Sequence, residues 1–248
     1  MTTVPLISVI TVTYNAADVI GKTLESLKHQ SFQDFEHIII DGASKDNTLK
    51  IIEDKGLPQS IVISEADKGL YDAMNKGLRK AKGKYVIFLN AGDTFHDSFS
   101  LLKYAISALK DKDIIYGDTV IVNGEGEKIA DRHLSVPEKL TLKSFSDGML
   151  ICHQAFMVKK ELAPDYDLNY RFSADYDWCV KCISNASSEN CENLKTVTID
   201  YLSDGLTDNN KLESLKERFN IMSKHYGLPL TLSKHFGFIF RALRRGKI

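Results

Sequence analysis

The sequence predicts an α/β fold, a single domain whose mostly parallel central sheet carries helices on both faces. In the first half, short β-branched runs alternate with segments of helical periodicity. Continuous apolar runs such as residues 85–89 are typical of strands buried on both sides. The 248 residues, 43% of them hydrophobic and 26% charged, can bury one sizeable core, and this composition excludes a disordered chain.

Strand–helix alternation accounts for about the first 90 residues. Each predicted strand is an apolar run, and each predicted helix carries apolar residues on one face, as Ile20, Leu24 and Leu27 do. In chain order the predicted elements are strand 6–12, helix 17–30, strand 36–40, helix 44–53, strand 60–64, helix 71–82 and strand 85–89. Strands connected through helices in this way pair in parallel.

The second half is less regular. Its predicted elements are helix 99–109, strand 113–122, the apolar run 150–158, helix 174–183, strand 195–201 and the charged amphipathic helix 211–226. The sequence has neither an internal repeat nor a clear linker, so we expect residues 1–248 to form one domain.

Charge and missing motifs exclude several classes of function. The formal net charge of -1 provides no overall field for nucleic acid. No apolar run approaches the roughly 20 residues that span a bilayer, which predicts a cytoplasmic protein, soluble or peripheral to a membrane. The first strand is not followed by G-x-G-x-x-G, and the chain has no G-x-x-x-x-G-K-[ST]. A dinucleotide oxidoreductase and a P-loop NTPase are therefore not expected.

Polar residues follow each of the first four predicted strands. These segments are Thr13-Tyr14-Asn15, Asp41-Gly42-Ala43-Ser44, Glu65-Ala66-Asp67-Lys68-Gly69 and Asn90-Ala91-Gly92-Asp93. One such cluster is commonly a helix cap. Four in succession indicate a ligand site, because ligands of open α/β sheets bind at the carboxyl ends of the strands.

Four segments together resemble family 2 glycosyltransferases of the GT-A fold: P-L-I-S-V-I-T-V-T-Y-N, I-I-I-D-G-A-S-K-D-N-T, E-A-D-K-G-L-Y-D-A-M-N-K-G and F-L-N-A-G-D. The resemblance is strong over about residues 4–95 and continues faintly to about 207. It implies a nucleotide-sugar-binding half (about 1–95), an acceptor-side half (about 96–207) and a C-terminal helical extension (about 208–248).

The resemblance also implies the donor site. The first loop would hold the base and ribose, Asp41 would accept a hydrogen bond from a uracil or thymine N–H, and Asp67 would lie against the base or ribose. Lys76 or Arg79 would meet a diphosphate oxygen. The expected nucleotide- and donor-binding residues are Thr11, Thr13, Tyr14, Asn15, Asp41, Gly42, Ser44, Asp67, Gly69, Asp72, Asn75, Lys76, Asn90, Ala91 and Gly92.

The expected metal site departs from the family pattern. Members commonly carry Asp-x-Asp to hold Mg²⁺ or Mn²⁺ against the diphosphate, whereas Asn90-Ala91-Gly92-Asp93 keeps only the last carboxylate. A hard divalent ion can take one protein carboxylate together with phosphate oxygens and water. Asp93 is therefore the predicted ligand of Mg²⁺ or Mn²⁺.

On the acceptor side, Ala174-Asp175-Tyr176-Asp177-Trp178 resembles the family segment that provides the general base. Asp175 is the predicted base and Asp177 its competitor, although either acid can simply cap the helix. His153, Asp177 and Thr207 are predicted acceptor or diphosphate contacts. The resemblance implies inverting transfer of one sugar from a nucleotide-diphosphate sugar, with a UDP-sugar the expected donor, to a hydroxyl of a glycan or lipid-linked acceptor.

The sequence leaves two alternative functions open and also predicts a contact with a membrane. A nucleotidyltransferase would need a Gly-rich basic loop after the first strand, which Thr13–Ala17 does not provide. A non-catalytic nucleotide-sugar-binding or scaffold protein would explain the reduced metal motif. In the segment 234–248, apolar residues at helical spacing accompany Lys234 and several arginines, which predicts peripheral contact with the inner face of the plasma membrane.

Overall fold

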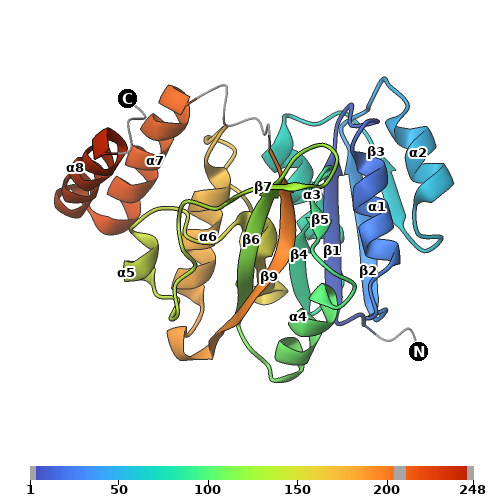
Figure 1. The fold of residues 1–248 in the computed structure, drawn as a ribbon, viewed down its shortest axis with the longest axis horizontal. Helices are drawn as coiled ribbons and strands as arrows, with labels where there is room; N and C mark the ends of the chain where they lie inside the picture. The colour runs from blue at the N-terminus through green and yellow to red at the C-terminus, as the bar shows by residue number, and fades with distance from the viewer. Residues whose placement is uncertain (1–3, 204–210, 245–248) are drawn as a thin grey trace.

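The computed structural model describes the backbone of residues 4–203 and 211–244, and the side chains of 4–203 and 212–238. Four strands of the first half lie side by side in the order β3-β2-β1-β4, and all three pairs are parallel (Figure 1). They are β1 (Ile7–Thr13), β2 (Phe35–Asp41), β3 (Ile61–Ser64) and β4 (Tyr85–Phe88). This half of the sheet confirms the prediction, because each strand is connected to the next through a helix or a long crossover.

The second half makes the sheet mixed rather than mostly parallel. β6 (Ile114–Val122) pairs in parallel with β9 (Cys191–Leu202), but the other pairings of this half are antiparallel. The antiparallel strands are β5 (Thr94–Phe95), β7 (Lys128–Asp131) and β8 (Phe156–Lys159). Between β6 and β8 the only described α-helix is the four-residue α5 (Leu142–Phe145), too short for a crossover, so β8 returns antiparallel to both β6 and β4.

The longer helices form where apolar periodicity predicts them. They are α1 (Ile20–Lys28), α2 (Thr48–Lys55), α3 (Leu70–Lys80), α4 (Ser100–Leu109), α6 (Ala174–Asn185) and α7 (Lys211–Tyr226). α8 (Leu228–Arg244) extends the predicted C-terminal amphipathic segment and packs against α7 at one end of the molecule (Figure 1). None of the described helices is long and apolar enough to cross a membrane.

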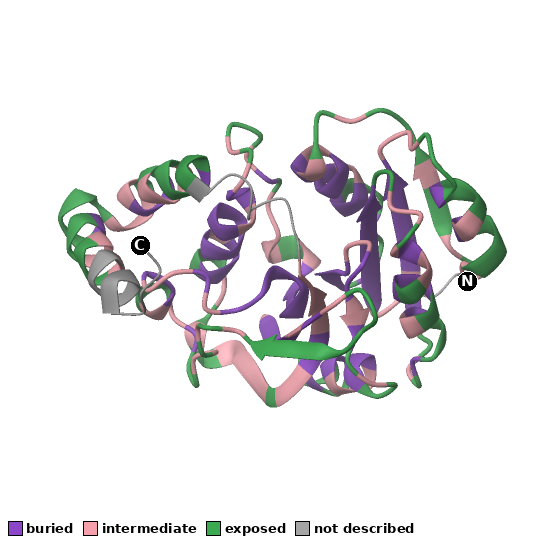
Figure 2. Cartoon of the chain, turned by 45° about the horizontal axis from the view of Figure 1, so that its top comes forward, coloured by how far each residue is buried: buried purple, intermediate pink, exposed green. Residues whose placement is uncertain are grey.

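Alternating side chains of β2 show that helices cover both faces of the sheet. Ile39 packs with Ile20 and Leu24 of α1 and with Ile52 of α2. Ile38 and Ile40 point to the opposite face and belong to the larger core, which includes residues of α3. The central strands are accordingly buried on both sides, whereas β7 is exposed at the surface (Figure 2).

A buried side chain of α3 fastens the first half of the chain to the second. Asn75 is 3% exposed. Its Nδ2 donates to the carbonyl of Tyr166 at 3.0 Å, and its Oδ1 accepts the Tyr166 N–H at 2.7 Å. One amide therefore satisfies both backbone groups of a buried residue 91 positions away.

We predict that Asn75→Ala lowers the free energy of unfolding by about 2–5 kcal/mol, because it leaves a backbone N–H and a carbonyl buried without partners. Urea denaturation measures the loss. Arg79→Ala is the matched control, because Arg79 joins the same helix to the same loop through an exposed ion pair with Asp165 at 3.1 Å. An exposed pair contributes at most about 1 kcal/mol, so equal losses in the two variants would contradict the prediction.

Candidate functional site

The carboxyl ends of β1 and β2 are joined by hydrogen bonds between their loops. The Asn15 N–H donates to Ser44 Oγ at 2.8 Å, and Asn15 Oδ1 accepts the Lys45 N–H at 2.8 Å. Asn15 and Ala43 have left-handed backbone angles, with φ of 46° and 60°. The structure thus brings the first two predicted donor segments together at one edge of the sheet.

Asp41 lies inside this edge rather than on its surface. Its side chain is fully buried and accepts hydrogen bonds from the Ser44 N–H at 3.0 Å, the Ser44 hydroxyl at 2.5 Å and the Ser64 hydroxyl at 2.6 Å. Asp41 therefore ties the β2 loop to β3, and the geometry does not fit its predicted contact with a base N–H. Ser44 is likewise engaged in holding this loop.

The open part of the edge lies around Gly42, beside Asp67 and Tyr14. A Cβ on Gly42 would come within 2.6 Å of Asp67 Oδ2 and 3.2 Å of the Tyr14 ring, so the missing side chain lets these residues approach each other. Tyr14 is 63% exposed. Asp67 Oδ1 accepts the Gly69 N–H at 2.8 Å, and no described residue donates to Asp67 Oδ2. An aromatic face and a carboxylate oxygen are both available to a ligand here.

The two threonines of β1 differ. Thr11 is fully buried, and its hydroxyl lies 3.0 Å from His37 Nε2 inside the sheet, so it does not fit the predicted ligand contact. Burial lowers the pKa of His37 to about 3, which keeps this imidazole neutral. Thr13 is also buried, but its Oγ1 has no hydrogen-bond partner among the described residues. Thr13 thus keeps a polar atom that a ligand can satisfy.

The predicted contacts on α3 are engaged with protein groups. Asn75 holds the backbone of Tyr166, as described above, and so is structural. Lys76 Nζ lies 2.8 Å from the Ala66 carbonyl and 3.0 Å from Glu65, while Asp72 accepts the Lys68 N–H at 3.0 Å. Arg79 pairs with Asp165 at 3.1 Å, in the loop that Asn75 also holds. This helix shapes the loop that carries Asp67 instead of presenting a row of ligand contacts.

Asp93 is a buried tether. It is 4% exposed, its Oδ1 accepts the Leu202 N–H at 3.0 Å, and its Oδ2 accepts from Gln154 Nε2 at 2.8 Å. Burial raises the pKa of Asp93 to about 7, although both hydrogen bonds act in the opposite direction. The carboxyl group connects the β4 loop to β9 and to the 3₁₀ turn His153–Ala155.

These surroundings do not fit the predicted divalent ion. Both oxygens of Asp93 already face N–H donors, and no group of three or more His, Cys, Asp or Glu side chains among the described residues could hold a metal ion. Gly92 has a φ of 100°, a backbone conformation that strains any L side chain, and a Cβ there would lie 2.7 Å from a terminal methyl of Leu202. A second carboxylate at Gly92 would therefore be strained. Asn90 Oδ1 is buried without a described partner, so it remains an open acceptor.

The two predicted bases of α6 have opposite surroundings. Asp177 is fully buried, 2.7 Å from His225 Nε2 of α7 and 2.6 Å from Lys181 Nζ. Burial raises the pKa of Asp177, but these two partners outweigh it and lower the pKa below its usual value. Asp175 is partly exposed, and only its Oδ1 accepts hydrogen bonds from described residues. Asp177 is a structural anchor between helices, and Asp175 is the acid available to a substrate.

His153 belongs to an aromatic cluster behind Asp175. It is 4% exposed and its Nε2 lies 2.5 Å from the Tyr166 hydroxyl. Burial lowers the pKa of His153 to about 4, against the opposing effect of the Asp175 charge, so the ring is neutral at pH 7. Its burial leaves little surface for the predicted acceptor contact. The other predicted contact of this kind, Thr207, lies outside the described residues.

Two residues of interest were not among the predicted site residues. The Tyr71 hydroxyl lies 3.3 Å from Asp175 Oδ1, a contact between positions 104 apart that no local pattern signals.

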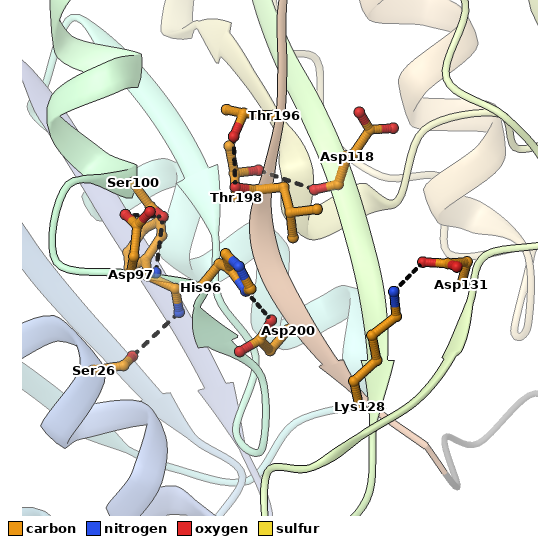
Figure 3. A network of polar contacts seen from close by, with 12 residues as sticks. Ser26, His96, Asp97, Ser100, Asp118, Lys128, Asp131, Thr196, Thr198 and Asp200 are labelled. Carbon is orange, nitrogen blue, oxygen red and sulfur yellow. Dashed lines mark hydrogen bonds and ion pairs between the residues drawn. The ribbon is translucent and has the colours of Figure 1, made fainter.

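Asp118 of β6 has a raised pKa because it is partly buried, with Arg132 acting in the opposite direction. Figure 3 shows its carboxylate pointing away from the His96–Asp200 pair, while the Asp118 carbonyl accepts from Thr198. The feature that draws attention to Asp118 is the partial burial of its carboxylate, which can be seen in the structure but not in the sequence.

Comparisons with known proteins agree with one another. The model of a family described as Glycosyl transferase family 2 matches residues 8–166. A PGL/p-HBAD biosynthesis glycosyltransferase of Mycobacterium bovis is 34% identical over 193 residues, covering 73% of this chain and 71% of the relative. A putative teichuronic acid biosynthesis glycosyltransferase of Bacillus subtilis, TuaG, is 30% identical over 63% of each chain.

Solved structures share the fold at low identity. TarS of S. aureus in complex with UDP-GlcNAc has a TM-score of 0.71 and 20% identity, covering 94% of this chain and 73% of that one. A mannosyltransferase of Pyrobaculum calidifontis in complex with GDP-Man and Mn²⁺ has a TM-score of 0.60 and 16% identity, covering 94% and 74%. The mixed sheet is thus of the GT-A type found in TarS.

The raised pKa of Asp93 predicts a pH-dependent stability. Between about pH 4 and pH 7 the folded state binds more protons at Asp93 than the unfolded state does. The contribution of Asp93 to the free energy of unfolding therefore falls as pH rises, by on the order of 4 kcal/mol in total. Asp93→Asn removes this titration. We expect the difference in unfolding free energy between wild type and variant to favour wild type more at pH 5 than at pH 8. Urea denaturation at both pH values tests this, and a constant difference would contradict it.

Proposed function

Because the chain belongs to glycosyl transferase family 2, we propose that this glycosyltransferase moves one sugar from a nucleotide-diphosphate sugar to an acceptor hydroxyl, with inversion at the anomeric carbon. The main support for this mechanism is that Asp175, in the first turn of α6, keeps one carboxylate oxygen free of described donors. The family makes a nucleotidyltransferase or a non-catalytic scaffold less well supported than transfer.

The donor base belongs in the open part of the edge around Gly42. Tyr14 offers a face for stacking, and Asp67 Oδ2 offers an acceptor for the imide N–H of uracil, taking the role predicted for Asp41. Support for UDP comes from the TarS structures in complex with UDP and UDP-GlcNAc. The orphaned Thr13 Oγ1 and Asn90 Oδ1 are acceptors for ribose or sugar hydroxyls.

In the reaction, Asp175 accepts the proton of the acceptor hydroxyl while that oxygen forms a bond to the anomeric carbon. The bond from that carbon to the diphosphate oxygen breaks, and its electron pair leaves with the diphosphate. A positioned carboxylate contributes roughly 100- to 10,000-fold to such a step.

Both oxygens of Asp93 are occupied by N–H donors of Leu202 and Gln154, so the described residues provide no built site for Mg²⁺ or Mn²⁺ at this carboxylate. The mannosyltransferase in complex with GDP-Man and Mn²⁺ is a precedent for a divalent ion in this fold. We therefore propose that any Mn²⁺-dependent gain in UDP affinity does not require the Asp93 carboxylate.

We predict that Asp175→Asn lowers kcat for sugar transfer about 100- to 10,000-fold while leaving UDP affinity within about twofold, because the base is lost and the nucleotide edge is not. The assay measures transfer from UDP-sugars to a hydroxyl acceptor, and calorimetry measures UDP binding. Asp165→Asn is the matched control, an exposed acid in the loop before α6. Near-wild-type transfer by Asp175→Asn would refute the proposed base. UDP binding by wild type without any turnover would favour the scaffold alternative.

The acceptor is proposed to be a hydroxyl of a glycan or lipid-linked glycan, and α8 provides the means to reach it. Leu228, Leu232 and Phe236 are 53%, 43% and 71% exposed at a spacing of four residues, which places them in one stripe. Thr231 and His235 lie beside this stripe, on the side of α8 that packs against α7: Thr231 is fully buried, and His235 meets the Phe219 ring edge to face at 5.0 Å.

Charge favours a membrane over a second copy of the chain as the partner of this stripe. Residues 218–248 contain seven Lys and Arg and not one Asp or Glu, but Lys224 and Lys234 are paired with Asp167 and Asp147 of the same chain, so the charge for a membrane comes chiefly from the other five. Two such segments repel each other, whereas an anionic lipid surface attracts both the charge and the apolar stripe. The predicted contact through 234–248 thus includes described residues up to 238, while the side chains of Ile239, Phe240, Leu243 and the arginines lie outside the described set. This would place the enzyme at the cytoplasmic face of the plasma membrane.

We predict that the protein floats with vesicles containing about 30% phosphatidylglycerol, that added salt weakens this binding, and that Phe236→Ser weakens it several-fold because the stripe loses its largest apolar contact. Phe99→Ser is the matched control, an equally apolar side chain that is 55% exposed at the N-cap of α4. Equal binding to neutral vesicles, or equal loss in both variants, would contradict docking through α8.

A further inference from the structure

Tyr71 joins the donor motif to the proposed base. It lies in the first turn of α3, between Gly69 and Asp72, and is 7% exposed. Its hydroxyl is 3.3 Å from Asp175 Oδ1, at the long end for a hydrogen bond between oxygens. The same Oδ1 accepts the Tyr176 N–H at 2.8 Å. Both described donors therefore act on one oxygen of the carboxylate, and Oδ2 receives none from the described part of the chain.

The ring of Tyr71 is held in place from behind. It stacks on Tyr166, with ring centroids 5.7 Å apart and an interplanar angle of 21°. Tyr166 stacks in turn on Trp178 at 5.0 Å and 9°. Asn75, one helical turn after Tyr71, fixes the Tyr166 backbone through two hydrogen bonds. The Tyr71 hydroxyl is thus directed at Asp175 by packing and not by a flexible side chain.

The chemistry of the pair sets the direction of its hydrogen bond. Burial, together with the negative charge of Asp175, raises the pKa of Tyr71 well above its usual value. The phenol therefore stays protonated and donates to the carboxylate.

We propose that Tyr71 is a positioning residue for catalysis: it anchors Oδ1 of Asp175 and so presents Oδ2 to the acceptor hydroxyl. This inference rests on the proposed role of Asp175 as base. The proton of the acceptor hydroxyl passes to Oδ2, while the acceptor oxygen bonds to the anomeric carbon and the diphosphate departs with its bonding electrons. Tyr71 keeps its own proton throughout.

The test is a double-mutant cycle on kcat for transfer, using Tyr71→Phe, Asp175→Asn and the combined variant. We expect Tyr71→Phe to lower kcat about 10- to 100-fold, with the donor KM and UDP affinity within about twofold. In the Asp175→Asn background, where the anchored carboxylate is gone, we expect the same change to lower the residual rate less than twofold.

Tyr166→Phe is the matched control, because it removes a hydroxyl from the same stack that contacts His153 and not Asp175. We expect it to lower stability but to keep kcat within about twofold, measured well below its melting temperature. A wild-type kcat in Tyr71→Phe, or an equal loss in the Asp175→Asn background, would overturn the positioning role. Full transfer by Asp175→Asn alone would instead refute Asp175 as the base. The two proposals, Asp175 as base and Tyr71 as its positioning residue, are therefore refuted by different results.

Discussion

The hydrogen bonds between Asn75 and the backbone of Tyr166 are the constraint on which the proposed active site depends. They fix a residue of the second half against a helix of the first half, at a position where water cannot replace a lost partner. Tyr166 then stacks with Trp178 of α6 on one side and Tyr71 of α3 on the other. Asp175, at the start of α6, is therefore held in a defined position relative to the sheet edge at which the sugar donor is proposed to bind.

The acids of this chain divide according to how many protein donors their oxygens meet. Asp41, Asp93 and Asp177 are each buried and have partners on both oxygens, so they connect loops, strands or helices. Asp67 and Asp175 are more exposed, and each keeps one oxygen free of described donors. The second group can exchange a hydrogen bond with water for one with a substrate at little cost, whereas the oxygens of the first group are buried against the protein donors that they hold.

The burial of Asp93 also explains why the chain can keep only one carboxylate in the segment where related enzymes carry Asp-x-Asp. Around Asn90-Ala91-Gly92-Asp93 the chain uses its one carboxylate to hold β9 and the His153–Ala155 turn, and the positive φ of Gly92 would strain any side chain at that position. The β4 loop is shaped by packing against the second half. Its remaining open polar atom, Asn90 Oδ1, is suited to a neutral donor such as a sugar hydroxyl.

Sequence patterns were sufficient to predict the parallel half of the sheet, because β1 to β4 and their helices follow from local periodicity within about 90 residues. They also predicted polar segments at the strand ends, and the family resemblance offered Asp175 as the base with Asp177 as its competitor. Tertiary structure decided the antiparallel entry of β8, which depends on strand pairing and not on its own apolar run. It also separated acids that keep an oxygen free of described donors from acids that hold the fold, because the partners of Asp93 come from Gln154 and Leu202 and the second donor to Asp175 comes from Tyr71. An acid looks the same in the sequence whichever role it has, since its role is set by donors that only folding brings to it.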